Sequence, residues 1–416
     1  MNTRPLVPGG DCDDHELTTP VSVDDRRIRV AILGSTGSIG VSALRVIERH
    51  PERFEVTVLA ANRSVEALQA QAQCHTPRRV IVCDETAYHR YTGGGAEWVG
   101  GRDGLIESVT RSDVDVVVNG LVGFAGLEPS LRALAAGKRL ALANKESLVA
   151  GAELMATALR EGGGQLVPID SEHSAVMQCL EGQQRDSVAR VVLTASGGPF
   201  RGWEAERMAG IQAEDALQHP TWDMGVKVTV DSATLANKAL EVIEAHFLYG
   251  ISYDRIEAVV HPQSIVHSFV EFVDGSVIAQ LGFPTMELPI LYALTYPERL
   301  ADPELRTFDP VKSSPLTFEP IDLDAFPLFQ IGNEAGRRGG TAPAVFNAAN
   351  EVAVAAFLIG DLSFRMIADV VGEVMTRAKT RPVTHLEEVL EADGEAREIA
   401  RKLVQRERST VRGLNG

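Results

Sequence analysis

The 416-residue sequence is short of three things: paired cysteines, long apolar runs and basic charge. Its four cysteines include no Cys-x-x-Cys pair, which argues against a zinc site or a disulfide framework and predicts free thiols. No apolar run approaches the length of a membrane span, and a composition of 44% hydrophobic and 23% charged residues is typical of a soluble globular protein. We therefore expect a cytoplasmic protein with no membrane partner.

Acidic residues outnumber basic ones by 57 to 40, which gives a formal net charge of −17. This charge opposes non-specific binding to nucleic acid, so no nucleic-acid partner is expected, and a phosphorylated substrate would need a local patch of positive potential. Residues 1–26 are polar and acidic, lack the basic and apolar regions of a secretion signal, and are predicted to be a disordered extension. The chain length predicts about two or three domains.

Ordered sequence begins with RRIRVAILGSTGSIG, which ends at Gly40 and is typical of a buried strand followed by a glycine-rich turn. Gly34, Gly37 and Gly40 would allow backbone N–H groups to approach a pyrophosphate at the start of the next helix. The spacing is GxxGxxG rather than the commoner GxGxxG, and a plain strand-to-helix turn is the alternative. The pattern therefore favours a dinucleotide site.

The following strand bears on the choice of cofactor. It ends in Asn62, Arg63 and Ser64, where a protein that prefers NAD usually places an acidic residue to hold the ribose 2′-OH. An arginine with amide and hydroxyl neighbours suits a 2′-phosphate instead. The sequence therefore predicts NADPH.

Strand-like and helix-like segments then alternate through RRVIVCD, VDVVVNG, KRLALAN and QLVPID, with a helix expected from about 127 to 136. This alternation predicts a doubly wound parallel sheet with functional groups at the carboxyl ends of its strands. Asn144, Lys145 and Glu146 lie at such an end, beside the expected nicotinamide edge of the cofactor. A capping turn that opens the next helix explains these three residues equally well.

Two carboxylates, Asp170 and Glu172, lie two residues apart at the end of another expected strand. Converging carboxylates repel each other unless a cation or a proton joins them, and their oxygens suit Mg²⁺ or Mn²⁺. Glu241 is the obvious third ligand, although only the fold could bring it close. For an isolated pair, a solvated acidic surface is the better explanation.

Glu241 belongs to VDSATLANKALEVIEAHF, expected as a helix over 230–247. Its apolar side chains form one stripe, and Asn237 and Glu241 lie on a polar stripe. Helix geometry alone favours an amphipathic helix with a solvated face. The acidic pair upstream and the loop HPTWDMG before this helix favour a functional face instead.

The motifs GSTGSIG, ANKE, PIDSEHSA, LTASGGPF, HPTWDMGVKVTVDSATLANKALEVIEAHF, HPQSIVHS, QLGFPTMELPI and FNAANEVAVAAF occur in this order. Together they resemble the 1-deoxy-D-xylulose 5-phosphate reductoisomerase family, and the match runs from about Arg27 to the C-terminal region. The resemblance implies an NADPH-dependent rearrangement, by retro-aldol cleavage and a new aldol, followed by hydride transfer. The product would be 2-C-methyl-D-erythritol 4-phosphate of non-mevalonate isoprenoid synthesis.

The resemblance also implies roles for individual residues. The metal ligands would be Asp170, Glu172 and Glu241, with Lys145 also catalytic. The substrate would be bound by Ser171, Glu172, Ser196, His219, Trp222, Met224, Ser232, Asn237, Lys238 and Glu241; of these, Ser196, Ser232, Asn237 and Lys238 would hold its phosphate, and His219, Trp222 and Met224 would form a lid. The cofactor would contact Gly34, Ser35, Thr36, Gly37, Ser38, Ile39, Gly40, Asn62, Arg63, Ser64, Asn144, Lys145 and Glu146. His173 and His267 would lie near the site, whereas His246 is expected to be structural.

The expected fold class is α/β, with an N-terminal Rossmann-like doubly wound parallel sheet, a central α+β catalytic domain with an antiparallel sheet, and a C-terminal helical bundle. The expected boundaries are 27–169 for the NADPH-binding domain, 170–309 for the catalytic and dimerisation domain, and 310–416 for a connector and the helical domain. A hairpin with Asp274 and Gly275 at its turn is predicted in the second of these. Its sheet is a natural dimer surface, and the family implies a homodimer.

Three positions depart from the family pattern. Thr285 stands where the family usually has Asp, and Asn62 and Ser64 replace the usual Gly and Asn beside the 2′-phosphate. Two other functions remain open: another sugar-phosphate or semialdehyde dehydrogenase, and a non-catalytic NADPH-binding regulator. The first would not need three separated carboxylates, and the second would be expected to have lost some of the charged site residues.

Overall fold

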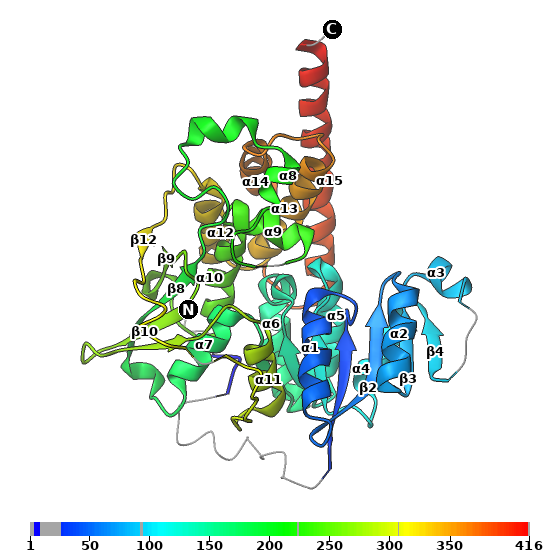
Figure 1. Cartoon of the computed structure of the whole chain (residues 1–416). Helices are drawn as coiled ribbons and strands as arrows, with labels where there is room; N and C mark the ends of the chain where they lie inside the picture. The colour runs from blue at the N-terminus through cyan, green and yellow to red at the C-terminus, as the bar shows by residue number, and fades with distance from the viewer. Residues whose placement is uncertain (1–3, 9–25, 92–94, 223, 307, 415–416) are drawn as a thin grey trace.

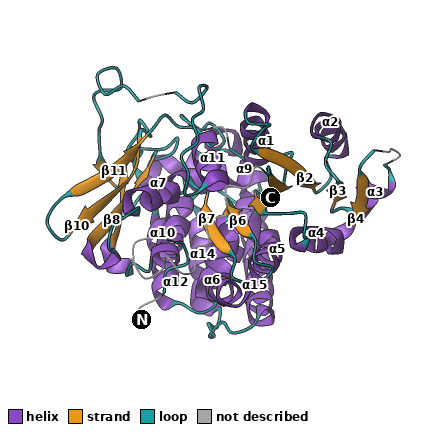
Figure 2. Cartoon of the chain, turned by 90° about the horizontal axis from the view of Figure 1, so that it is seen from below, coloured by secondary structure: helices purple, strands orange, loops and turns teal. Residues whose placement is uncertain are grey.

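The computed structural model describes residues 4–8, 26–91, 95–222, 224–306 and 308–414 (Figure 1). Two sheets are joined by central helices, and a group of C-terminal helices packs beside them. Figure 2 shows α7 (Ser171–Leu180) and α10 (Ala236–Tyr249) between the two sheets. Within the described ranges, no helix is both long enough and apolar enough to cross a membrane.

The first sheet has seven strands in the order β4-β3-β2-β1-β5-β6-β7, and every pairing is parallel, as the alternation predicted. Its strands are β1 (Ile28–Leu33), β2 (Phe54–Ala61), β3 (Arg79–Val82), β4 (Glu97–Gly100), β5 (Val116–Asn119), β6 (Arg139–Leu142) and β7 (Gln165–Pro168). The connecting helices are α1 (Ser38–Arg49), α2 (Val65–His75), α3 (Glu85–His89), α4 (Gly101–Thr110), α5 (Leu127–Ala135) and α6 (Lys145–Gly162). The order reverses between β1 and β5, which places the glycine-rich turn after β1 at the topological switch point.

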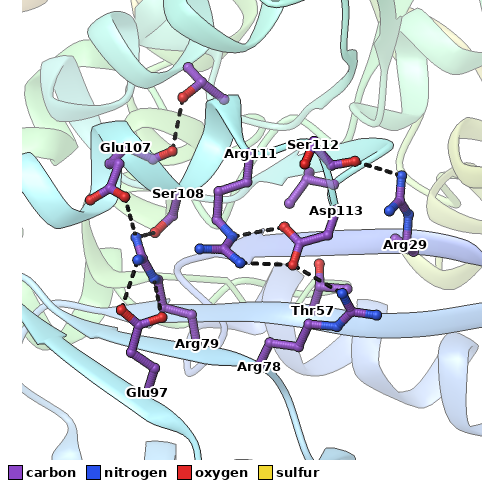
Figure 3. A network of polar contacts seen from close by, with 12 residues as sticks. Arg29, Thr57, Arg78, Arg79, Glu97, Glu107, Ser108, Arg111, Ser112 and Asp113 are labelled. Carbon is purple, nitrogen blue, oxygen red and sulfur yellow. Dashed lines mark hydrogen bonds and ion pairs between the residues drawn. The ribbon is translucent and has the colours of Figure 1, made fainter.

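Ion pairs tie the β3 and β4 edge of this sheet to α4 and the loop after it (Figure 3). Arg79 pairs with Glu97 at 2.8 Å and with Glu107 at 3.2 Å, while Arg111 holds Asp113 at 2.7 Å. The Arg111 hydrogen bond, opposed by partial burial, lowers the pKa of Asp113 to about 2. These ion pairs join the edge strand β4 and its neighbour β3 to α4.

The second sheet has five strands in the order β11-β10-β8-β9-β12. They are β8 (Val188–Ala195), β9 (Ile256–Val260), β10 (Val266–Phe272), β11 (Val277–Leu281) and β12 (Glu319–Pro320). The predicted hairpin is present as β10 and β11, but β8 and β9 are parallel, so the sheet is mixed rather than antiparallel. A parallel pair requires a long crossover, and that crossover contains the loop HPTWDMG, α9 (Val226–Ala233) and α10. β12 lies in the expected connector and pairs with β9, which joins the connector to this sheet.

The C-terminal helices form the predicted bundle. They are α12 (Pro327–Arg338), α13 (Ala342–Leu358), α14 (Met366–Arg377) and α15 (Leu386–Leu414), preceded by α11 (Glu287–Thr295), which packs against α1. α13 is buried over most of its length, and it contacts α15, α14, α6 and α9. It therefore supports the helices that carry the residues of interest.

The segment expected as one helix over 230–247 is two. Leu235 has a left-handed φ of +57° and separates α9 from α10, so the single-helix prediction is wrong at this point. The solvated face is absent as well: Lys238, Glu241 and Glu244 are all less than 5% exposed. Charged side chains at this depth must be paired, and their partners form the site described below.

The N-terminal extension also differs from expectation. Leu6 and Val7 are buried, and both backbone N–H groups donate to the Leu248 carbonyl at the end of α10. Residues 4–8 are therefore packed rather than disordered. Residues 1–3 and 9–25, to which the same expectation applied, lie outside the described part of the chain.

Candidate active site

Three carboxylates from two helices meet between the sheets. Asp170 is the N-cap residue of α7 directly after β7, Glu172 lies in the first turn of α7, and Glu241 lies one turn into α10. One carboxylate oxygen from each residue lies within 4.8 Å of the other two, although Glu241 is far away in the sequence. The fold thus brings together the three residues that were expected to bind a metal ion.

Two lysines lie among these carboxylates. Lys145 Nζ is 2.8 Å from Asp170 and 3.0 Å from Glu241, and Lys238 Nζ is 3.0 Å from Glu172 and in closer contact with Glu241. Burial opposes the Lys145 charge, but Asp170 and Glu241 raise its pKa well above the ordinary value. Three carboxylates against two ammonium groups leave one negative charge in excess, in a buried place where excess charge is costly.

The pKa shifts show that Glu172 is the carboxylate most destabilised by the excess negative charge. Burial and the neighbouring Glu241 charge raise the pKa of Glu172 to about 7, whereas Lys145 lowers the pKa of Asp170 despite burial. A divalent cation with oxygen ligands would remove the repulsion that raises the Glu172 value. Ser171 already donates to Glu172 at 2.6 Å, which fixes the carboxylate in place. The donor set fits Mg²⁺ or Mn²⁺.

A buried pair, His173 and Glu244, lies beside Asp170 of the carboxylate cluster. His173 Nε2 is 3.1 Å from Glu244, and both groups are buried. With Asp170 they form another possible ligand set, but the pair is closed by its own hydrogen bond and is less exposed than Glu172. We assign it a positioning role. Sequence reasoning gave Glu244 no role, although its spacing of three from Glu241 was a usable signal.

The loop after β8 positions Ser196. His219 Nδ1 accepts hydrogen bonds from the Thr221 and Trp222 N–H groups, so the ring proton is on Nε2 and is donated to Ser196 Oγ at 3.0 Å. The Gly198 N–H also donates to Ser196 Oγ. With both acceptor positions occupied, the Ser196 hydroxyl proton is directed outward, as a phosphate ligand would require.

The other expected phosphate residues are placed unevenly. The segment that carries Ser196 and the helix that carries Ser232 lie side by side: a Cβ on Gly198 would lie only 2.9 Å from the Ser232 carbonyl oxygen. Asn237 and Lys238 instead point to the carboxylates: the Asn237 carbonyl oxygen is 2.6 Å from Lys145 Nζ, and its amide donates to Glu241. Trp222 and Met224 are half-buried in the loop before α9, and residue 223 between them lies outside the described residues.

The glycine-rich turn lies where β1 and β5 end. Gly34 has φ +78°, and a Cβ there would lie 2.7 Å from the Gly120 carbonyl oxygen, so only glycine fits. Gly37 is the N-cap residue of α1, and it and Ser38 are exposed, whereas Thr36 and Ile39 are half-buried and Gly40 is buried against the turn. The Ser35 N–H donates to the Ala60 carbonyl and its hydroxyl to Gln71, and its expected contact with the cofactor stays a prediction.

A cavity of about 400 Å³ lies beyond the end of β2. Arg63 and Arg90 line it together with Glu66 and Asp84, and Asn62 and Ser64 are exposed nearby. Arg63 is 76% exposed and donates to Asp84 at 2.7 Å. Arg90 was not anticipated from the sequence, because it lies far along the chain in the segment after α3. Two guanidinium groups at one cavity suit a 2′-phosphate.

Asn144 and Glu146 are buried rather than open to a ligand. Asn144 donates to the Gly123 carbonyl and to Glu146, and Glu146 accepts from Lys227 at 2.9 Å. Lys227 also pairs with Asp231 at 2.6 Å. Of the three residues expected at the nicotinamide edge, only Lys145 points into the carboxylate cluster. Sequence reasoning missed Lys227, since nothing local shows that a lysine in the first turn of α9 pairs with two buried carboxylates.

Three remaining expectations concern single residues. His267 is buried next to Gly282, and burial lowers its pKa to about 4. His246 is half-buried; its Nδ1 donates to the Ile251 carbonyl and its ring stacks on Tyr253, so its contacts are those of a structural residue. Thr285 Oγ1 accepts from the Glu287 N–H at 3.2 Å, so the departure from Asp keeps a hydrogen bond at the start of α11.

Family models match three parts of the chain. The model for 1-deoxy-D-xylulose 5-phosphate reductoisomerase matches residues 30–152, the model for the C-terminal domain of that protein matches 166–249, and a DXP reductoisomerase C-terminal domain matches 281–399. Two curated relatives with the name 1-deoxy-D-xylulose 5-phosphate reductoisomerase are similar over most of their length. The protein of Chloroherpeton thalassium is 49% identical over 374 residues, which cover 89% of this chain and 96% of the relative. That of Rhodococcus jostii is 50% identical over 387 residues, which cover 92% and 96%.

Solved structures agree with this similarity. The reductoisomerase of Zymomonas mobilis in complex with NADPH has a TM-score of 0.85 and 41% identity, with 91% of this chain and 99% of that chain covered. A DOX-P reductoisomerase in complex with NADPH, fosmidomycin and magnesium also has a TM-score of 0.85, with 37% identity and coverage of 91% and 98%. The similarity therefore extends over both sheets and the C-terminal helices.

Proposed function

The chain belongs to the 1-deoxy-D-xylulose 5-phosphate reductoisomerase family, and on that premise we propose that it converts 1-deoxy-D-xylulose 5-phosphate to 2-C-methyl-D-erythritol 4-phosphate with NADPH. The enzyme is an NADP-dependent oxidoreductase of non-mevalonate isoprenoid synthesis. The observation that carries the proposal is that Asp170, Glu172 and Glu241 meet two lysines between the two sheets.

Asp170, Glu172 and Glu241 would hold Mg²⁺ or Mn²⁺. When bound, the metal ion supplies Lewis-acid stabilisation of an enediolate, and NADPH supplies the hydride. The chain itself provides the surrounding charge. Lys145 and Lys238 balance two of the three carboxylates, so that the loaded site has a net positive charge and attracts an anionic substrate. This local positive charge would let an anionic substrate bind although the whole molecule has a formal net charge of −17.

The substrate phosphate would be bound by Ser196 and Ser232, with Asn237 and Lys238 turning toward it from the carboxylates. Ser196 supports this role because His219 and Gly198 occupy its acceptor positions and leave its proton to donate. Trp222 and Met224, on the same loop as His219, would close over the carbon skeleton and exclude water. Arg63 and Arg90 would hold the 2′-phosphate of NADPH.

The proposal includes a homodimer formed through the edge of the second sheet. β11 is an edge strand, and Val277 and Ile278 on it are exposed, at 54% and 39%. An open strand edge with exposed apolar side chains favours pairing with another strand. The cytoplasmic location expected from the composition remains a prediction.

The test is NADPH oxidation by the purified protein with 1-deoxy-D-xylulose 5-phosphate, with Mg²⁺ or Mn²⁺ and then with a chelator. We expect turnover only with the metal ion, and a roughly 100-fold loss in Glu241→Gln, because the amide keeps one oxygen but loses the negative charge that binds the cation. Glu257→Gln is the matched control, since Glu257 is an exposed carboxylate paired with Arg190 on the second sheet.

Folded protein that binds NADPH but gives no turnover with either metal would contradict the enzyme assignment and favour the regulator. Turnover that is equally lost in Glu257→Gln would show that the ligand assignment, rather than the reaction, is wrong.

A further inference from the structure

The N-terminal segment Arg4–Pro8 binds to the end of the helix that carries Glu241. The N–H groups of Leu6 and Val7 both donate to the Leu248 carbonyl, at 3.1 and 3.3 Å. Leu248 is in the last turn of α10, where carbonyls have no partner within the helix. The segment therefore caps α10 from outside, although it is far from α10 in the sequence.

Arg185 joins the same segment to α10 by its side chain. One guanidinium nitrogen donates to the Val7 carbonyl at 2.8 Å and the other to the Tyr249 carbonyl at 3.2 Å. Val7 and Pro8 also line a small hollow with Met177 and Leu180, both on α7. Backbone bonds to α10 and apolar contacts to α7 thus come from one short piece of chain.

These contacts lead directly to the carboxylate cluster. The Tyr249 hydroxyl donates to the His173 backbone carbonyl, and His173 follows Glu172 in the chain. His173 is in turn bonded to Glu244 of α10. The ends of α7 and α10 are therefore held together on one side by the N-terminal segment and on the other by the residues next to the expected ligands.

We propose that residues 4–8 are an intramolecular clasp that sets the spacing of α7 and α10 and thereby positions Glu172 and Glu241 for the metal ion. The inference rests on the proposed function of that site and adds a positioning element to it. The first family-model match begins at residue 30, so the clasp lies outside the matched region. Its two buried side chains, Leu6 and Val7, explain why a polar extension contains an apolar pair.

The test compares the full chain with Leu6→Ser/Val7→Ser and with a deletion of residues 1–8. The control is Arg4→Ala, because Arg4 is exposed in the same segment. We expect the apparent Mg²⁺ affinity, measured from turnover and separately by calorimetry, to fall by about three- to tenfold in the first two variants, less than for a direct partner of a ligand. The NADPH affinity, measured by fluorescence, should stay within about twofold, because the cofactor loop is on the other sheet.

An unchanged Mg²⁺ affinity in both variants would overturn the clasp, as would an equal loss of Mg²⁺ and NADPH affinity, which would indicate general destabilisation. Arg185→Met serves as a second route to the same contact if the deletion fails to fold. Failure of the proposed function is distinguishable, because the unaltered full chain would then bind NADPH without turnover.

Discussion

At the residue scale, the tautomer of His219 decides what Ser196 can offer to a phosphate. The ring accepts two backbone N–H groups at Nδ1 and must donate from Nε2. A protonated ring would lose the Nδ1 acceptor and release the turn at Thr221 and Trp222. The charge state of one imidazole thus controls both the Ser196 hydroxyl and the loop that carries Trp222.

We predict that His219 stays neutral until the pH falls to about 4, because burial lowers its pKa to about that value. The unfolded chain would take up a proton on this residue near pH 6.5, before the folded chain does, so this group reduces stability as the pH falls from about 6.5 toward 4. A histidine-selective NMR titration, assigned with His219→Gln, measures the value. A ring that titrates near 6.5 would contradict the interpretation of the loop.

At the element scale, Lys227 joins three helices. Its ammonium group lies between Glu146 of α6 and Asp231 of α9, and Asp231 accepts from Asn350 of α13 at 2.8 Å. Asn144, the neighbour of Lys145 in the chain, donates a hydrogen bond to Glu146. The start of α9, where the loop HPTWDMG ends, is therefore anchored to α6, the helix that carries Lys145.

Lys227→Met should lower the free energy of unfolding by about 3 kcal/mol, because it leaves two buried carboxylates without their shared cation. Lys227→Met combined with Glu146→Gln and Asp231→Asn should recover most of the loss. Lys312→Met is the control, since Lys312 is 84% exposed, and its effect should be within about 0.5 kcal/mol. Chemical denaturation checks each value. A Lys227→Met effect as small as that of the control would refute the anchor.

At the scale of the whole molecule, the open edge of the second sheet is the place where two chains would join. Ile278→Lys should shift the protein from dimer to monomer at micromolar concentration, because a charge on an edge strand blocks strand pairing. Light scattering after gel filtration measures the mass. Val311→Lys is the matched control, because Val311 is an 85% exposed apolar residue on the connector. A dimer that persists in Ile278→Lys would place the interface elsewhere.

The parallel sheet and the C-terminal helices could be predicted because their signals are local. Buried strands followed by glycines, alternating with helical segments, specify a doubly wound sheet without reference to distant residues. The hairpin turn at Asp274 and Gly275 is equally local. The break at Leu235 was missed because a non-glycine residue in the left-handed region is held there by tertiary packing and has no sequence signal.

The class of fold, the family and the three candidate metal-binding carboxylates could be read from the sequence alone, since these depend on short motifs and their order. Only the tertiary structure decided which charges meet. Lys145 and Lys238 among the carboxylates, Lys227 between Glu146 and Asp231, and the N-terminal segment on α10 all join residues far apart in the chain. Such pairs are fixed by the need to neutralise or cap groups that the fold buries, and burial is a property of the folded chain as a whole.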